Sequence, residues 1–206
     1  MPEHSGHKPG PTLDKYELDI LMDKQFLLTK HRVTDKAQQL LSHTRDSLIQ
    51  ELEPHAGSLP EGISWQNSKI SRGENYGGLP YLVLDCPKAF TARDVFTFRT
   101  MIWWGNEISA TLHLQGSYLR PYRSKVLEAI ARGYLDSYYI SVGDSPWEYH
   151  FQPDNYLPAT RLGEAEKHRL HTSAFIKIAT KWSLDKWLET PVRASEAWKE
   201  MAGYIF

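Results

Sequence analysis

Residues 94–116, DVFTFRTMIWWGNEISATLHLQG, predict one long β-hairpin, and the pairing of its two strands decides the fold. A two-residue turn at Gly105 and Asn106 scatters the apolar side chains over both faces of the hairpin. A three-residue loop of Trp104, Gly105 and Asn106 gathers them on one face. Because burying each large side chain is worth about 1.5–3 kcal/mol, we choose the second register. The core residues expected from it are Phe96, Phe98, Ile102, Ile108, Leu112 and Leu114.

The opposite face of this hairpin is polar in its middle and aromatic at its tip. Antiparallel sheets commonly leave one face in water, so a solvated surface is the simplest interpretation. The alternative is the floor of a pocket, because a guanidinium binds carboxylate or phosphate groups and an imidazole titrates near neutral pH. The candidate ligand-binding residues on this face are Arg99, Trp103, Thr111 and His113.

The composition is that of a globular protein and excludes several classes of partner. The 206 residues are 41% hydrophobic and 24% charged, and the net charge of −1 disfavours nucleic-acid binding. No apolar run approaches the roughly 20 residues of a membrane helix, and the N-terminus lacks the apolar segment of a secretion signal. With Cys86 as the single cysteine, we expect a cytoplasmic protein that binds neither nucleic acid nor membrane.

Apolar spacing outside the hairpin predicts helices at both ends of the chain and strands between them. Residues 1–12 are expected to be a disordered tail, and residues 13–206 a single domain. The predicted helices cover residues 14–29, 33–52, 121–132, 184–189 and 190–203. The further strands are predicted at residues 68–72, 81–85, 138–142, 147–151 and 173–182.

This order of elements favours an α+β fold over alternating βαβ units. We expect an antiparallel sheet of about six strands built from hairpins. Two N-terminal helices, one central helix and two C-terminal helices should pack against it.

Two further patterns have a chemical interpretation beside a structural one. Glu164, His168 and His171 would lie on one face of a helix as zinc ligands do, but the same residue types are common on exposed helices. We therefore predict no metal and no cofactor. Cys86 ends an apolar strand and is expected to be a buried structural thiol; His113 would be its base if their hairpins were neighbours in the sheet.

No motif in this sequence identifies an activity, and no residue stands out as catalytic. The leading hypothesis is a domain whose polar sheet face is covered and binds a small polar or anionic ligand. The alternative is a protein-interaction or homodimerisation module that uses the aromatic hairpin tip around Trp103 and Trp104. A hydrolase of unknown substrate is the third hypothesis.

Overall fold

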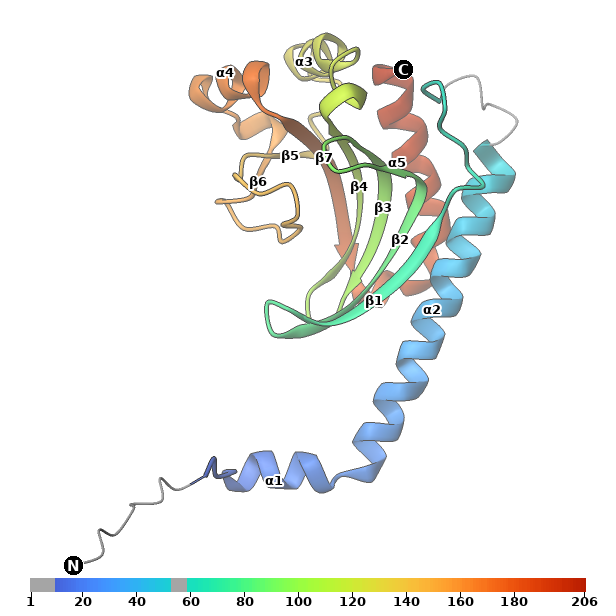
Figure 1. The fold of residues 1–206 in the computed structure, drawn as a ribbon, viewed down its shortest axis with the longest axis vertical. Coiled ribbons are helices and arrows are strands. Elements are labelled where there is room, and N and C mark those ends of the chain that lie inside the picture. Colours follow the sequence, from blue (N-terminus) through green and yellow to red (C-terminus); the bar gives the residue numbers. More distant parts are fainter. Residues whose placement is uncertain (1–9, 53–58) are drawn as a thin grey trace, which may run out of the picture. The chain divides into compact units, whose positions relative to one another are not determined.

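Seven antiparallel strands form one sheet in the structure, a computed structural model that describes residues 10–52 and 59–206 (Figure 1). Their order across the sheet is β1-β2-β3-β4-β7-β5-β6. The strands are β1 (Lys69–Tyr76), β2 (Leu79–Phe90), β3 (Val95–Trp103), β4 (Glu107–Gln115), β5 (Tyr139–Ser141), β6 (Tyr156–Pro158) and β7 (Phe175–Ser183). The predicted α+β fold is confirmed, with one strand more than the six expected.

The described helices occur before, within and after the strand-rich part of the chain. They are α1 (Lys15–Met22), α2 (Lys24–Leu52), α3 (Arg123–Ala131), α4 (Glu164–Thr172) and α5 (Thr190–Ile205), with short 3-10 segments η2 (Gly116–Tyr118), η3 (Ala159–Arg161) and η4 (Leu184–Glu189). Among the described residues, no helix combines the length and the apolar character needed to cross a bilayer.

The boundary between the first two helices differs from the prediction. It was expected between residues 29 and 33 but falls at Asp23, and α2 continues unbroken through the expected gap. The Asp23 carboxylate accepts a hydrogen bond from the Phe26 backbone N–H at 2.9 Å, which caps the start of α2. No Gly or Pro interrupts residues 24–52, so nothing in the backbone ends the helix earlier.

The hairpin formed by β3 and β4 has the register chosen from the sequence. Phe96 pairs with Leu114, Phe98 with Leu112 and Ile102 with Ile108, so the loop consists of residues 104–106. Gly105 supplies the positive φ of this loop, at +71°. The six predicted core residues of the hairpin are all buried and belong to one apolar cluster.

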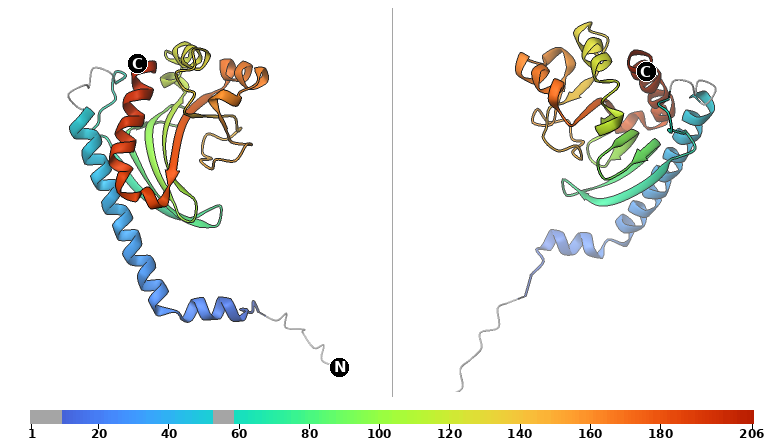
Figure 2. Two further views of the ribbon diagram at one scale, coloured as in Figure 1. Left: turned by 180° about the vertical axis from the view of Figure 1, so that it is seen from behind. Right: turned by 45° about the horizontal axis from the view of Figure 1, so that its top comes forward.

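This apolar face of the sheet packs against helices. Helix α5 contributes Trp198, whose ring lies 5.4 Å from that of Phe98 and 4.8 Å from that of Trp65 between centroids. The buried residues of α2 in the same cluster are Ala37, Leu40, Leu41 and Leu48. Figure 2 shows α5 lying along this side of the sheet. The main core therefore lies between the helices and one face of the sheet, and no part of this core covers the opposite face.

The opposite face is covered by the segment between β5 and β6, residues 142–155, which we call the covering loop. The strand predicted at residues 147–151 is wrong, because this stretch has no regular secondary structure and the partner of β5 is β6. Its aromatic side chains pack onto the sheet instead of forming a ladder: Tyr149 is buried, and the Phe151 ring stacks on Tyr156 at 4.8 Å. The alternation of aromatic residues at 147–151 therefore reflects packing against other parts of the fold and not a β-strand.

The chain divides into two compact units, Met1–Lys36 and Ala37–Phe206. The sheet and the covering loop lie in the second unit. The single domain over residues 13–206 and the disordered tail stay predictions, and residues 1–9 of that tail lie outside the described residues.

Candidate functional site

The polar face of the sheet is enclosed by protein and is not a solvated surface. Side chains alternate along β2, β3, β4 and β7, so the polar ones share one face of the sheet. On this face Arg99, His113 and Lys177 contact the covering loop. In one row across the sheet, Thr97, His113 and Lys177 are direct cross-strand neighbours. All three are 0% exposed. The interpretation of this face as an ordinary wet surface is therefore wrong, and titratable groups are buried beneath the loop.

Arg99 is paired with an acid from its own sheet. Its Nε lies 2.7 Å from Oδ1 of Asp85, and its Nη2 lies 2.9 Å from Oδ2, so the guanidinium and the carboxylate form a two-point ion pair. The Thr97 hydroxyl donates a further hydrogen bond to Oδ1 at 3.0 Å. Asp85 thus neutralises Arg99, which the sequence analysis had named as a candidate partner of an anionic ligand.

Lys177 is the buried cation that sequence reasoning missed. Its ammonium donates a hydrogen bond to the Glu148 backbone carbonyl, and it lies over the rings of Tyr149 at 4.8 Å and Tyr156 at 5.0 Å. Among the described residues it forms no ion pair with a carboxylate. Burial lowers the pKa of Lys177 to about 7, the negative charge of Glu148 opposes this shift, and Arg99 adds to it. At neutral pH the polar face therefore holds one partly protonated, unneutralised amine.

A sequence signal for Lys177 existed. The strand at 173–182 places this lysine on the same face as Phe175 and Ala179, between apolar neighbours. A charged residue flanked by such neighbours points either to a solvated face or to a functional one. The pairing of β7 with β4, which brings Lys177 opposite His113, is not visible in the alternation.

His113 is buried in its neutral form. Burial is the main reason that its pKa falls to about 3, and the positive charges of Lys177 and Arg99 lower it further, while the Gln115 side chain raises it slightly. Its Nδ1 lies 3.1 Å from the Tyr149 hydroxyl. Its Nε2 is buried without a hydrogen bond of normal geometry among the described residues. The Gln115 side chain therefore interacts with the ring without a hydrogen bond of normal geometry to Nε2.

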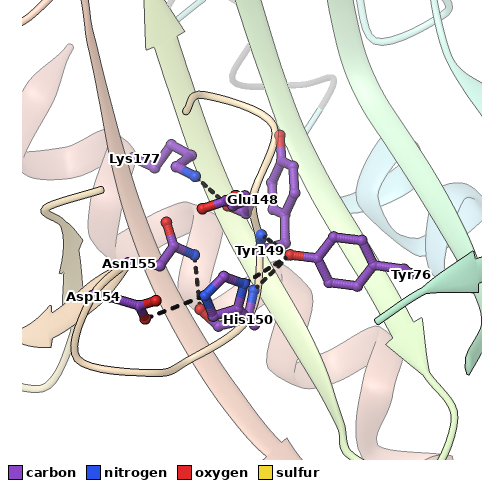
Figure 3. Close-up of polar contacts among 7 residues, drawn as sticks. All are labelled: Tyr76, Glu148, Tyr149, His150, Asp154, Asn155 and Lys177. Atoms are coloured by element: carbon purple, nitrogen blue, oxygen red, sulfur yellow. Dashed lines mark hydrogen bonds and ion pairs between the residues drawn. The ribbon is translucent and has the colours of Figure 1, made fainter. Parts of the chain in front are cut away.

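Tyr76 holds the covering loop from the side of β1 (Figure 3). The backbone N–H groups of Tyr149 and His150 donate to its hydroxyl oxygen at 2.6 and 3.1 Å. Within residues 144–151 no backbone group bonds to the backbone of a strand, so side chains attach this part of the loop to the sheet. Burial raises the pKa of Tyr76, and the two backbone N–H groups counteract part of that shift. This part of the loop is held by the polar contacts with Tyr76 and by the packing of the Tyr149 ring on the sheet.

Asp154, His150 and Tyr76 form a chain of polar contacts that resembles the order of a catalytic triad. His150 Nε2 lies 3.3 Å from Oδ1 of Asp154, and Nδ1 lies 3.1 Å from the Tyr76 hydroxyl. A nucleophile in such a chain needs room for a reacting atom at its oxygen. The Tyr76 oxygen already has three polar neighbours, His150 Nδ1 and the two backbone N–H groups, so this geometry favours a clamp over a nucleophile.

Two other candidate ligand-binding residues occupy different parts of the polar face. Thr111 is buried in the middle of β4, directly between Arg99 and Ala179. Trp103 lies at the end of β3, where its indole N–H donates to the Tyr76 carbonyl at 3.0 Å. Trp104 is half-buried against the main core. Arg99, Thr111 and His113 are thus brought together, whereas Trp103 belongs to the Tyr76 side.

Cys86 lies on the apolar face, opposite to that of His113, so the two do not form a nucleophile and base pair. Its thiol is buried, and burial raises its pKa to about 12. This agrees with the structural thiol expected from the sequence.

The residues with metal-ligand spacing lie on helix α4. Glu164 pairs with Lys167 at 3.1 Å, and the His168 and His171 rings are 6.4 Å apart. Within residues 10–52 and 59–206, no group of three or more His, Cys, Asp or Glu side chains is arranged to hold a metal ion.

Three comparisons with known proteins found no match for this chain: no protein-family model, no curated protein and no solved structure matches it.

Proposed function

We propose that the polar face beneath the covering loop binds a small anion, a carboxylate or a phosphate, with Lys177 as its charge partner. The observation that supports this proposal is a fully buried amine without a carboxylate partner among the described residues. Burying an unpaired ammonium is costly, and proteins retain such groups mainly where they have a function. An anionic ligand would supply the missing negative charge.

Charge balance favours a ligand with a single negative charge, and so a monocarboxylate over a phosphate, which becomes a dianion above neutral pH. Arg99 and Asp85 neutralise each other, and His113 is uncharged at neutral pH, so protonated Lys177 is the excess charge of the polar face. Arg99 then positions the Tyr149 ring of the covering loop, because its guanidinium lies 4.6 Å from the centre of that ring. In this proposal His113 Nε2 and the Thr111 side chain, both buried on this face, orient the ligand.

Entry of the ligand requires the covering loop to move. Opening it separates Lys177 from the Glu148 carbonyl and the Tyr149 ring, and it separates Tyr76 from the loop backbone (Figure 3). Opening also exposes the buried Tyr149 ring, but it leaves the pairing of β2, β3, β4 and β7 intact. Loop opening is a common means of admitting small ligands. The cytoplasmic location of the protein stays a prediction.

A thermal-shift screen with small monocarboxylates and inorganic phosphate tests this proposal. A saturating ligand at about 100 times its Kd should raise the Tm of the wild type by roughly 5–10 °C. Lys181→Met is the matched control, because Lys181 also lies on β7 but pairs with Glu107 at 3.0 Å. We expect the shift in the wild type and Lys181→Met and not in Lys177→Met. A ligand shift that survives Lys177→Met, or the lack of any stabilising anion, contradicts the proposal.

The affinity for the anion should depend on pH through Lys177. Its pKa of about 7 means that the amine loses its proton as the pH rises from 7 to 9, so the affinity should fall by up to about tenfold per pH unit. His113, with a pKa of about 3, stays neutral over this range. Calorimetry in two buffers of different ionisation enthalpy should show proton uptake on binding above pH 7. Affinity and proton uptake that do not change with pH would exclude Lys177 as the partner.

A further inference from the structure

Helix α1 and the start of α2 expose an unusual amount of apolar surface. Of the sixteen large apolar side chains exposed among the described residues, nine lie within residues 13–33. Three of them on α1 are among the most exposed: Tyr16 and Met22 at 73% and Leu21 at 62%. The others are Leu13, Leu18, Phe26, Leu27, Leu28 and Val33. Concentrated exposure of this kind marks an interaction surface.

Helix α1 lacks a packing partner within its own unit. It has eight residues, and none of them is buried. Isolated helices shorter than about 12–15 residues are marginal in water, so α1 needs contacts from elsewhere. It cannot fold back on α2, because Asp23 alone separates the two helices and an antiparallel helical hairpin needs a connection of about 2–5 residues.

The two parts of this segment have opposite charges. Residues 14–23 contain four acids and one lysine, for a net charge of −3. Residues 24–36 contain three lysines and one arginine against one aspartate, for a net charge of +3 with histidine neutral. An acidic apolar helix and a basic apolar helix are complementary in charge, yet within one chain the short connection prevents them from lying side by side.

We infer that this segment pairs with the same segment of a second copy of the chain. In the pair, α1 of each copy packs on residues 24–36 of the other, so the contact occurs twice around a two-fold axis. Such an isologous arrangement needs one self-complementary surface, and most homodimers are built this way. The exposed apolar residues of both helices become buried, and each acidic stretch meets a basic one.

A membrane surface is the less suitable occupant. Residues 14–36 carry no net charge, whereas amphipathic helices that bind anionic lipid are rich in Lys and Arg on their polar face. The surface is also independent of the polar face of the sheet, which lies in the other unit. Failure of the anion-binding proposal would leave this inference unchanged.

Sedimentation of the full chain at micromolar concentration tests the inference through its apolar contacts. The wild type should have twice the 23.8 kDa mass of the chain. The double substitution Leu21→Ser and Met22→Ser should give a monomer. Leu188→Ser removes an 86% exposed leucine outside this segment and should leave the dimer intact. A monomeric wild type, including one that binds neutral or anionic phospholipid vesicles, overturns the inference.

Charge exchange tests the arrangement of the two helices. One variant carries Glu17→Lys and Asp19→Lys, and the other carries Lys24→Glu and Arg32→Glu. Each variant alone brings like charges together, so each should dimerise at least tenfold more weakly than the wild type. An equimolar mixture should regain wild-type affinity, because the basic α1 of one variant then meets the acidic α2 of the other. Variants that dimerise like the wild type, or a mixture that stays monomeric, contradict the arrangement.

Discussion

Replacing Asp85 by asparagine is expected to lower the free energy of unfolding by about 3–5 kcal/mol. The substitution preserves the volume of the side chain but removes the charge that pairs with Arg99 at 2.7 and 2.9 Å. The guanidinium would stay beneath the covering loop without a counter-charge. Folded domains have total stabilities of about 5–15 kcal/mol, so the loss should be plain in urea denaturation followed by circular dichroism.

Asp154→Asn is the matched control for this prediction. Asp154 also forms an ion pair, with His150 at 3.3 Å, but its carboxylate is exposed and the change should stay below about 1 kcal/mol. A double variant, Asp85→Leu with Arg99→Met, removes both charges and should be more stable than Asp85→Asn, because no unpaired charge is left buried. Equal, small effects of Asp85→Asn and Asp154→Asn would show that the Arg99 pair is not buried in solution.

Lys177→Met is expected to make the protein more stable at neutral pH, by roughly 2–5 kcal/mol. The pKa of Lys177 is about 7 in the folded protein against 10.5 for an ordinary lysine. As the pH falls from about 10.5 to about 7, the unfolded chain takes up a proton that the folded one does not, so the wild type loses stability relative to the variant. Below about pH 7 both states are protonated and the difference stays constant.

Urea denaturation of both proteins at several pH values between about 6 and 10.5 measures this stability difference. The gap between Lys177→Met and the wild type should widen as the pH falls through this range and should be smallest at the alkaline end. Lys181→Met should show no such widening, because Lys181 is partly exposed and already paired with Glu107. If Lys177→Met were less stable at every pH, the contacts of Lys177 with the Tyr149 and Tyr156 rings would outweigh the cost of its burial.

The two predictions together distinguish structural from functional burial of charge. Asp85 and Arg99 neutralise each other's charge, so removing one should lower the free energy of unfolding. Lys177 has no carboxylate partner among the described residues. Removing it should raise the free energy of unfolding at neutral pH and abolish anion binding. A residue that lowers stability but is needed for binding is typical of functional sites.

Local periodicity accounts for the parts of the fold that could be predicted. The register of β3 and β4 follows from the positions of Phe96, Phe98, Leu112 and Leu114, since strands joined by three residues have few alternative pairings. The same period assigned Arg99, Thr111 and His113 to one face. It failed for residues 147–151, where the aromatic alternation serves packing against the sheet and not a strand.

The sequence by itself determined the α+β class, the hairpin register and the shared face of Arg99, Thr111 and His113, because these depend on the spacing of neighbouring side chains. Only the tertiary structure decided what those polar residues meet. Asp85 reaches Arg99 by the pairing of β2 with β3, and Lys177 reaches His113 by the pairing of β7 with β4. The covering loop then removes them from water. Burial and charge pairing depend on segments far apart in the chain, and such long-range contacts produce no periodic pattern among neighbouring residues.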